Sequence, residues 1–290
     1  MNDHARGAPD PCIAAARAYF PRGLEQPAGS FRFSADALLL AAFAVKSLGI
    51  AASSRSILEL GTGCGVVSFA FLLGLGPDAR IQNAILGIEK DPELVRAANR
   101  NALRLGLQPF FQALCADVAG IREHDDVLPE SRDIVIANPP YRNPGSGRLP
   151  RGERRTAALF ATGAGLQAFL AAAAYALRNR GRFFGVFGTE RLQEILEGLV
   201  QNRLVPKRLK PVYGAPGKDA RMALVEARKN GRPGLAFESP LFLYGASSDP
   251  GLTKEALAFC PALACNARQS ASCETEGKTA SEDEEDVARV

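Results

Sequence analysis

The chain has 290 residues, 47% of them hydrophobic and 23% charged, and a formal net charge of +4 at pH 7. This composition is ordinary for a soluble globular protein, and the length allows a full hydrophobic core. The longest apolar runs, at 37–45 and 168–177, are shorter than the roughly 18–20 residues of a membrane helix, and the N-terminus lacks the pattern of a signal peptide. We therefore expect a cytoplasmic protein with no membrane partner.

The cysteines and histidines follow no metal-binding pattern. No CxxC pair occurs, and the only histidines are His4 and His124. Zinc sites need closely spaced thiol or imidazole ligands, and disulfide frameworks are rare in cytoplasmic chains of this size. We expect neither a metal nor structural disulfides. The six cysteines are Cys12, Cys64, Cys115, Cys260, Cys265 and Cys273.

Charge is distributed unevenly along the chain. Residues 274–290 hold seven acidic and two basic residues, so this tail carries −5 and the part before it +9. The stretch 142–232 contains 18 Lys and Arg against 6 Asp and Glu. Such an excess favours a polyanionic partner, although a solvated basic surface would have the same composition.

The first part of the chain predicts little regular structure. Residues 1–29 form a lead-in before the domain. Its residues 1–23 are expected to be poorly ordered apart from a short helix at 13–19, and the aromatic stretch 26–33 predicts a short hairpin arm. A helix then begins, with Ser34 as its N-cap. Asp36 falls in the first turn, where a carboxylate suits the helix dipole. Alternatively, Asp36 contacts a cofactor from the edge of its site.

From residue 56 onward strands and helices alternate, which predicts an α/β fold with a mostly parallel sheet and helices on both faces. One domain is expected at 30–265, followed by an acidic disordered tail at 266–290 with too few apolar residues to fold. An extended segment at 240–244 and a short helix at 252–259 close the domain. Seven strands are expected at 56–60, 84–89, 110–115, 133–137, 182–188, 205–213 and 222–228, and helices at 65–74, 92–105, 156–178 and 189–201.

A buried strand runs into a glycine-rich turn at 61–65, with Gly61, Gly63 and Gly65 in a GxGxG spacing. Glycines permit a tight turn and a close approach of the backbone to a ligand. The spacing differs from the GxGxxG of a pyrophosphate-binding loop. Glu59, just before the turn, is suited to an ammonium group, which a phosphate site would not favour.

Two more acids follow the next strand ends. Glu89 lies 24 residues past Gly65, where an acid can bind the two hydroxyls of a ribose. Asp117 follows the third strand and can accept from an adenine amino group. Each acid alone could be a solvated residue at a strand end. Together, at the edge where ligands of such folds bind, they predict S-adenosylmethionine, which has an ammonium, a ribose and an adenine but no phosphate.

The fourth strand ends in Asn138-Pro139-Pro140-Tyr141. Two prolines cannot continue a helix or a sheet ladder, so they make a stiff corner after Asn138. An amide oxygen and a backbone carbonyl can accept both hydrogens of an NH2 group, and a tyrosine offers a face on which a planar group can stack. A Pro-rich turn at the end of a strand is the simpler interpretation.

Over roughly residues 30–230 these motifs resemble the class I S-adenosylmethionine-dependent methyltransferases. The Asn-Pro-Pro-Tyr motif resembles the branch that methylates adenine N6, guanine N2 or glutamine amide nitrogens. Residues 31–41, 57–65, 89–94 and 97–101 are similar to the tRNA1(Val) (adenine-37-N6)-methyltransferase family. Two features depart from that family, a longer link at 74–84 and the acidic extension past Cys265.

The resemblance implies a Rossmann-like methyltransferase domain at 30–265 that takes S-adenosylmethionine and acts on tRNA. It implies that Asn138, Pro139, Pro140 and Tyr141 are catalytic, and that arginines after the motif hold RNA phosphates. These arginines are Arg142, Arg148, Arg151, Arg154 and Arg155. The expected cofactor-binding residues are Asp36, Glu59, Gly61, Thr62, Gly63, Gly65, Glu89, Lys90, Asp117 and Asn138.

Three alternatives remain open from the sequence. The same corner would serve a glutamine-N5 methyltransferase that acts on a protein, or a guanine-N2 methyltransferase that acts on ribosomal RNA. A cofactor-binding RNA assembly factor without turnover is the non-enzymatic alternative.

Overall fold

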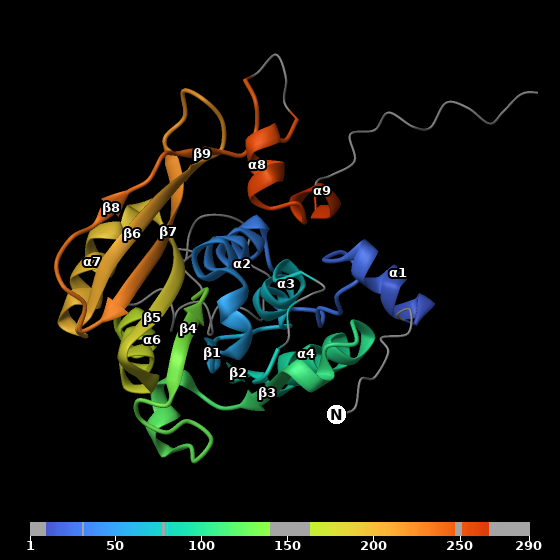
Figure 1. Cartoon of the computed structure of the whole chain (residues 1–290), viewed down its shortest axis with the longest axis horizontal. Helices are drawn as coiled ribbons and strands as arrows, with labels where there is room; N and C mark the ends of the chain where they lie inside the picture. The colour runs from blue at the N-terminus through green and yellow to red at the C-terminus, as the bar shows by residue number, and fades with distance from the viewer. Residues whose placement is uncertain are drawn as a thin grey trace, which may run out of the picture.

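The computed structural model describes residues 10–30, 32–76, 79, 81–139, 163–246 and 251–266. In these segments one sheet runs through the molecule in the order β3-β2-β1-β4-β5-β7-β6-β8, and β9 also pairs with β6 (Figure 1). Strands β1 to β5 are parallel, and β7 runs antiparallel between β5 and β6. The strands are β1 Ile57–Leu60, β2 Ile85–Glu89, β3 Phe111–Cys115, β4 Arg132–Ala137, β5 Leu177–Gly188, β6 Leu204–Tyr213, β7 Ala220–Lys229, β8 Ala236–Phe237 and β9 Leu241–Phe242.

The predicted fold class is confirmed, but the predicted number of seven strands is wrong. All seven expected strands occur, and β8 and β9 extend the sheet by pairing parallel with β6. Each of these two strands has two residues, which is too short for a periodic pattern to reveal. The expected extended segment at 240–244 contains β9.

Helices cover both faces of the sheet. They are α1 Pro11–Tyr19, α2 Ala35–Leu48, α3 Val66–Gly74, α4 Pro92–Arg104, α6 Gly163–Ala176, α7 Leu192–Gln201, α8 Lys254–Phe259 and α9 Leu263–Asn266, with short 3-10 turns η1 Gly49–Ser54, η2 Gln108–Phe110, η3 Val118–Glu123 and η4 Thr189–Arg191. Two hydrophobic clusters result, one under α2, α3 and α4 and the other under α6 and α7. Alternate residues of β4 belong to different clusters. Ile134 and Ile136 lie in the first cluster, and Val135 and Ala137 lie in the second.

The run Ala35–Ser54, which is α2 with η1, has 20 residues and a mean hydropathy of 1.7, long and apolar enough to cross a membrane by composition alone. The uninterrupted apolar run expected from the sequence, 37–45, is shorter because it stops before Lys46. In the fold, Leu38, Leu39 and Leu40 are fully buried in the first cluster, and α2 packs against α3 and β5. Its composition is therefore that of a central core helix.

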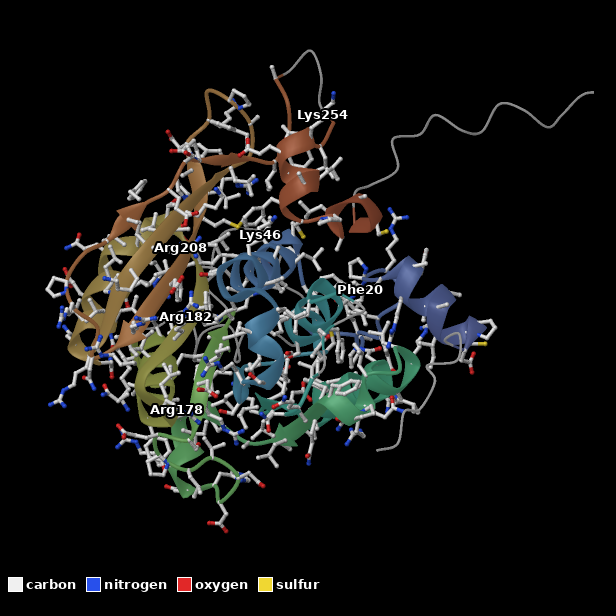
Figure 2. All side chains as sticks on the ribbon, in the orientation of Figure 1. Phe20, Lys46, Arg178, Arg182, Arg208 and Lys254 are labelled. Atoms are coloured by element: carbon white, nitrogen blue, oxygen red, sulfur yellow. The ribbon has the colours of Figure 1, made fainter. Side chains whose placement is uncertain are left out.

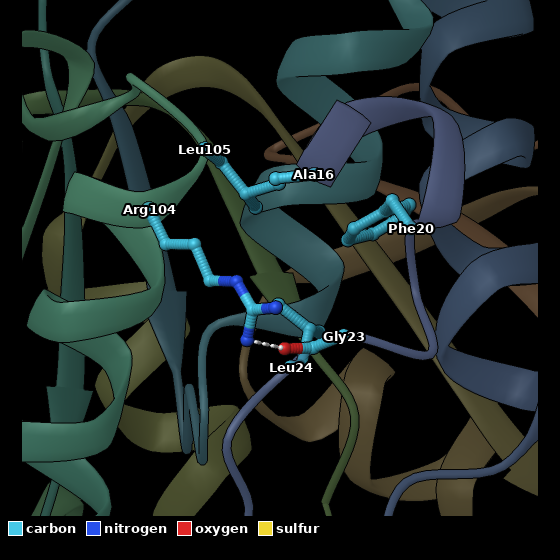
Figure 3. Close-up of a pocket in the computed structure, with 6 residues that line it drawn as sticks. All are labelled: Ala16, Phe20, Gly23, Leu24, Arg104 and Leu105. Atoms are coloured by element: carbon cyan, nitrogen blue, oxygen red, sulfur yellow. Dashed lines mark hydrogen bonds between the residues drawn. The ribbon is translucent and has the colours of Figure 1, made fainter. Parts of the chain in front are cut away.

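The short helix expected at 13–19 is confirmed by α1, but the expectation of poor order is wrong for residues 10–23. Phe20 and Leu24 are buried in the first cluster. The guanidinium of Arg17 donates to the carbonyl oxygen of Leu105 over 2.8 Å, and that of Arg104 donates to the carbonyl oxygen of Gly23 over 2.6 Å beside a small pocket (Figure 3). These contacts fasten the lead-in to the C-terminal end of α4.

The hairpin arm expected at 26–33 is also not formed by the described residues there. Residues 26–30 and 32–33 contain no strand. Instead the Ser30 hydroxyl donates to the carbonyl of Pro27, and the Phe33 amide donates to the side chain of Gln26. A turn closed by side chains thus leads into α2. Ser34 occupies the N-cap position, but its hydroxyl donates to Asp36 rather than accepting from the helix.

Strand β5 begins five residues earlier than expected, at Leu177, where the predicted helix would have continued to 178. Leu177 pairs with Arg132, and Arg182 pairs with Ile134, so the residues between them bulge from the ladder. Arg180 has a left-handed φ of +66° there, and a Cβ on Gly181 would meet the carbonyl oxygen of Arg178 at 2.9 Å. A bulge of this kind has no hydrophobic periodicity, so the sequence favours a loop.

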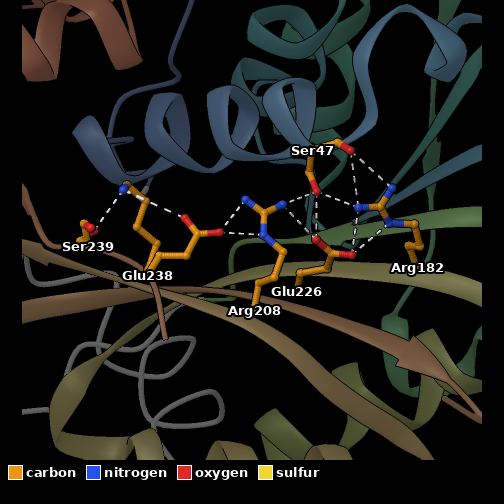
Figure 4. Close-up of polar contacts among 7 residues, drawn as sticks. Ser47, Arg182, Arg208, Glu226, Glu238 and Ser239 are labelled. Atoms are coloured by element: carbon orange, nitrogen blue, oxygen red, sulfur yellow. Dashed lines mark hydrogen bonds and ion pairs between the residues drawn. The ribbon is translucent and has the colours of Figure 1, made fainter. Parts of the chain in front are cut away.

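A polar cluster fills the space between the C-terminal end of α2 and the strands β5, β6 and β7 (Figures 2 and 4). Glu226, 4% exposed, accepts from Ser47 over 2.8 Å, from Arg182 over 2.9 Å and from Arg208 over 3.1 Å. Arg208 also donates to Glu238 over 2.5 Å. The buried carboxylate is satisfied only because three donors from three elements converge on it.

Removing that carboxylate should destabilise the fold strongly. Glu226→Ala leaves Arg182 and Arg208 without their shared partner, and we expect the free energy of unfolding to fall by about 3 kcal/mol. Glu194→Ala is the control, because Glu194 pairs with Arg191 three residues away at the surface and should cost less than about 1 kcal/mol. Urea unfolding measures both. Equal small losses would show that water replaces Glu226 at little cost.

Candidate active site

The glycine-rich turn between β1 and α3 is fixed by backbone hydrogen bonds to the neighbouring strand. The amides of Gly61 and Thr62 donate to the carbonyl oxygen of Ile88 over 2.8 and 2.9 Å. Gly61, Gly63 and Gly65 have φ of +70°, +56° and +89°, which side-chain-bearing residues rarely adopt. A Cβ on Gly65 would lie 2.4 Å from the ring of Phe69, whereas one on Gly63 would meet nothing within 4 Å. The turn therefore packs on its inner side and stays open at Gly63.

Glu59 lies beneath this turn and is 1% exposed. Its carboxylate accepts from the hydroxyl of Thr62 over 2.7 Å and from the hydroxyl of Ser68 in the first turn of α3. Burial raises its pKa to about 7, although both hydroxyls favour the ionised form. In the structure Glu59 therefore joins strand, turn and helix. Its predicted contact with an ammonium group stays a prediction.

Glu89 ends β2 and is half-buried beside the turn. Its carboxylate accepts from the amide of Gly63 over 3.0 Å and from the amide of Asp91 over 3.0 Å. Burial raises the pKa of this carboxyl, and the two amides oppose the shift. The contact brings Glu89 and the open part of the turn together, as the sequence analysis expected of a shared cofactor site.

The other residues expected to bind the cofactor, Asp117, Asp36 and Lys90, make local contacts. Asp117, exposed two residues after β3, caps η3 by accepting from the amide of Ala119 over 2.9 Å. Asp36, 3% exposed, accepts from the Ser34 hydroxyl and from the amide of Ala37. Lys90 is half-buried, and its carbonyl oxygen accepts from the thiol of Cys115. Their roles toward a cofactor remain predictions.

Asn138 and Pro139 reach this edge through the register of β4. Ala137 pairs with Leu60, so Asn138 follows β4 where Gly61 follows β1. Asn138 is half-buried and Pro139 is buried. The register thus places Asn138 beside the glycine-rich turn. The remaining predicted residues, Pro140, Tyr141, Arg142, Arg148, Arg151, Arg154 and Arg155, lie outside the described residues.

Two residues of the site were not singled out from the sequence. Ser68 is the one polar side chain in the helical segment 66–74, and that isolation could have indicated a buried partner. Asn101, 1% exposed, donates to the carbonyl oxygen of Cys64 in the turn over 3.1 Å and accepts from the amide of Glu25 over 2.8 Å. It joins α4, the turn and the lead-in, and no local pattern reveals such a contact.

Comparison with known proteins shows that this chain is similar to methyltransferases. A family model described as an RMKL-like methyltransferase domain matches residues 71–192. A tRNA1(Val) (adenine(37)-N6)-methyltransferase of Actinobacillus succinogenes is 33% identical over 112 residues, 39% of this chain and 42% of the relative. A protein of the same name from Porphyromonas gingivalis is 27% identical over 207 residues, 71% of this chain and 77% of the relative. The chain is an S-adenosylmethionine-dependent methyltransferase.

Two further similarities concern the fold and a related activity. A predicted O-methyltransferase of Agrobacterium tumefaciens has a similar structure, with a TM-score of 0.60 over 81% of this chain and 100% of its own, at 21% identity. A release factor glutamine methyltransferase of Pasteurella multocida is 33% identical over 105 residues, 34% of this chain and 33% of the relative. The first confirms the Rossmann-like sheet of the methyltransferase.

S-adenosylmethionine is the cofactor of such methyltransferases, and the residues at the carboxyl edge of the sheet suit it. The turn has an open backbone at Gly63, the carboxylate of Glu89 lies against that open part, and no phosphate-binding spacing is present in the turn. Within the described ranges no group of three or more His, Cys, Asp or Glu side chains is arranged to hold a metal ion.

The crowding at Gly65 can be tested with a matched glycine. Gly65→Ala and Gly76→Ala both place a Cβ at a similar φ, +89° and +85°, but a Cβ on Gly76 meets nothing within 4 Å. We expect Gly65→Ala to weaken S-adenosylmethionine binding at least about tenfold, because Phe69 must move and the turn with it. Gly76→Ala should cost about 1 kcal/mol of stability and leave the affinity unchanged. Isothermal calorimetry measures the affinities, and equal affinities would contradict the argument.

The buried carboxyl of Glu59 predicts a pH dependence of stability. Its pKa rises on folding from an ordinary 4.5 to about 7, so its stabilising effect is complete below pH 4.5 and is lost as the pH rises through 7. Glu59→Gln cannot ionise and should abolish this loss, which is at most about 3 kcal/mol. Melting temperatures measured from pH 5 to 8 test how steeply stability falls with pH, and Glu123→Gln is the control at an exposed position. A variant with the same slope as the wild type would disprove the assignment.

Proposed function

We propose that the methyltransferase transfers a methyl group to N6 of adenine 37 in the anticodon loop of a tRNA. The observation that carries this proposal is the place of Asn138 and Pro139, which follow β4 beside the glycine-rich turn. Relatives that bear the name of this activity support the choice of adenine and of tRNA.

The chain contributes to the proposed reaction mainly by positioning the substrate amine. An exocyclic amine is a poor nucleophile because its lone pair is delocalised into the ring. Acceptance of its two hydrogens by the Asn138 amide oxygen and the Pro139 carbonyl oxygen favours a pyramidal nitrogen with a localised lone pair. S-adenosylmethionine supplies the electrophilic methyl group when bound. Oriented acceptors of this kind lower the barrier through proximity and electrostatics.

A glutamine-N5 methyltransferase acting on a protein is the second candidate, because the release factor glutamine methyltransferase of Pasteurella multocida shares 33% identity over about a third of this chain. A glutamine amide also presents an NH2 group to the same two acceptors. The adenine proposal is preferred since the Porphyromonas gingivalis relative aligns over 71% of this chain. Guanine N2 is a further exocyclic amine that the same corner could hold.

Asn138→Ala should abolish methyl transfer while leaving S-adenosylmethionine affinity within a few-fold, because the substitution removes an acceptor for the substrate and not the cofactor turn. Asn83→Ala is the control, since its side chain donates to the carbonyl of Ser54 at an exposed position away from the site. Initial rates with labelled cofactor measure both variants. Normal turnover by Asn138→Ala would refute the assigned role.

The substrate is tested by incubating the enzyme and labelled S-adenosylmethionine with tRNA that lacks modification at position 37. Nucleoside analysis should recover the label as N6-methyladenosine. Label in N2-methylguanosine would move the assignment to guanine. Label that survives ribonuclease but is lost on proteolysis would favour the glutamine activity.

A further inference from the structure

Five cations gather at the edge of the sheet opposite the cofactor site. Because β7 is antiparallel to β5 and β6, the end of β7 meets the beginnings of those strands, and Figure 1 shows β7 ending at the lower left while β4 points upward. The amide of Asn230 donates to the carbonyl of Arg203, and the Asn230 side chain donates to Asn179 over 3.2 Å. The ammonium of Lys207 donates to the carbonyl of Arg232 over 3.1 Å. We call this group the amino-edge cluster: Arg180, Arg203, Lys207, Arg228 and Arg232.

The cluster differs from the other cations of the same half of the molecule. Arg178 pairs with Asp133, Arg182 and Arg208 with Glu226, and Lys229 with Glu130. In the described part of the chain, no member of the amino-edge cluster has an ion pair. Arg180, Arg203 and Arg232 are exposed, and Lys207 and Arg228 half-buried. The acids at this edge, Glu130 and Asp133, already pair with Lys229 and Arg178. The five like charges of the cluster therefore raise the local potential, which attracts a polyanion.

Apolar side chains beside the cluster fit the same kind of partner. Strand β8 pairs with β6 at Arg208 and Leu209, directly after Lys207. On β8 and just before it, Phe237 is 69% exposed and Leu235 46% exposed. An exposed aromatic ring beside cations can stack on an unpaired base while the cations neutralise phosphates.

We propose that the amino-edge cluster is a second RNA-binding surface, which holds a part of the substrate far from the methylated nucleotide. The proposal rests on the proposed function, since it takes the substrate to be RNA. The ten residues of β6 span roughly 30 Å at about 3.3 Å per residue, so the cluster lies far from the cofactor edge. A full-length tRNA is long enough to contact both edges, whereas a hairpin of the anticodon stem and loop is shorter.

The test compares two double variants that lose the same charge. Arg203→Gln with Arg232→Gln removes two exposed cluster members. Arg96→Gln with Lys254→Gln removes two exposed cations on α4 and α8, outside the cluster. Filter binding of full-length tRNA at several salt concentrations gives the affinity and its salt slope. The cluster variant should bind tRNA roughly five- to tenfold more weakly. Its plot of log affinity against log salt concentration should be shallower by about two units, and the control variant should match the wild type.

Methylation rates on full-length tRNA and on the anticodon hairpin provide a second test. The cluster variant should lose kcat/KM for full-length tRNA, keep its rate on the anticodon hairpin and keep its KM for S-adenosylmethionine. Equal RNA affinity and salt slope in both double variants would overturn the proposal. Absence of N6-methyladenosine with the wild-type enzyme would instead overturn the proposed function. Binding is measured without turnover, so the two failures are seen separately.

Discussion

The carboxylate of Glu59 is the contact on which the cofactor edge depends. It is wholly buried, and it accepts from Thr62 in the turn and from Ser68 in α3. A buried charge is tolerable only when donors surround it, so strand, turn and helix must keep one arrangement. The Gly63 amide, held by Glu89, extends the same arrangement to β2. The turn is therefore held by contacts within the chain, and such preorganisation lowers the entropic cost of binding.

Much of the fold follows from local patterns in the sequence. The strands of the parallel sheet and the GxGxG turn were predictable because periodicity and glycine act over a few residues. The position of Glu89 at a strand end was predictable for the same reason, since it ends a strand parallel to β1. The role of Asn138 toward a substrate and that of Asp117 toward a cofactor are not decided by such patterns, because they concern a ligand.

The errors arise where a residue's partner is distant in the sequence. The basic stretch 142–232 predicted a charged surface, yet Arg182 and Arg208 point inward to Glu226, and Lys229 donates to the buried carbonyl of Leu177. Composition counts charges and does not distinguish a solvated cation from a buried pair. The lead-in was misjudged likewise, because the buried side chain of Asn101, 76 residues away, satisfies the backbone of Glu25.

The candidate cofactor site and the amino-edge cluster differ in charge, and this fits the proposed reaction between a cationic cofactor and a polyanion. Glu59 lies in β1, Glu89 ends β2 and Asp117 follows β3. Negative charge at these positions would stabilise a sulfonium and an ammonium. The same acids repel phosphates. Under the proposed function, the amino-edge cluster gives an RNA substrate additional affinity at a distance from those carboxylates and without competing for the cofactor site.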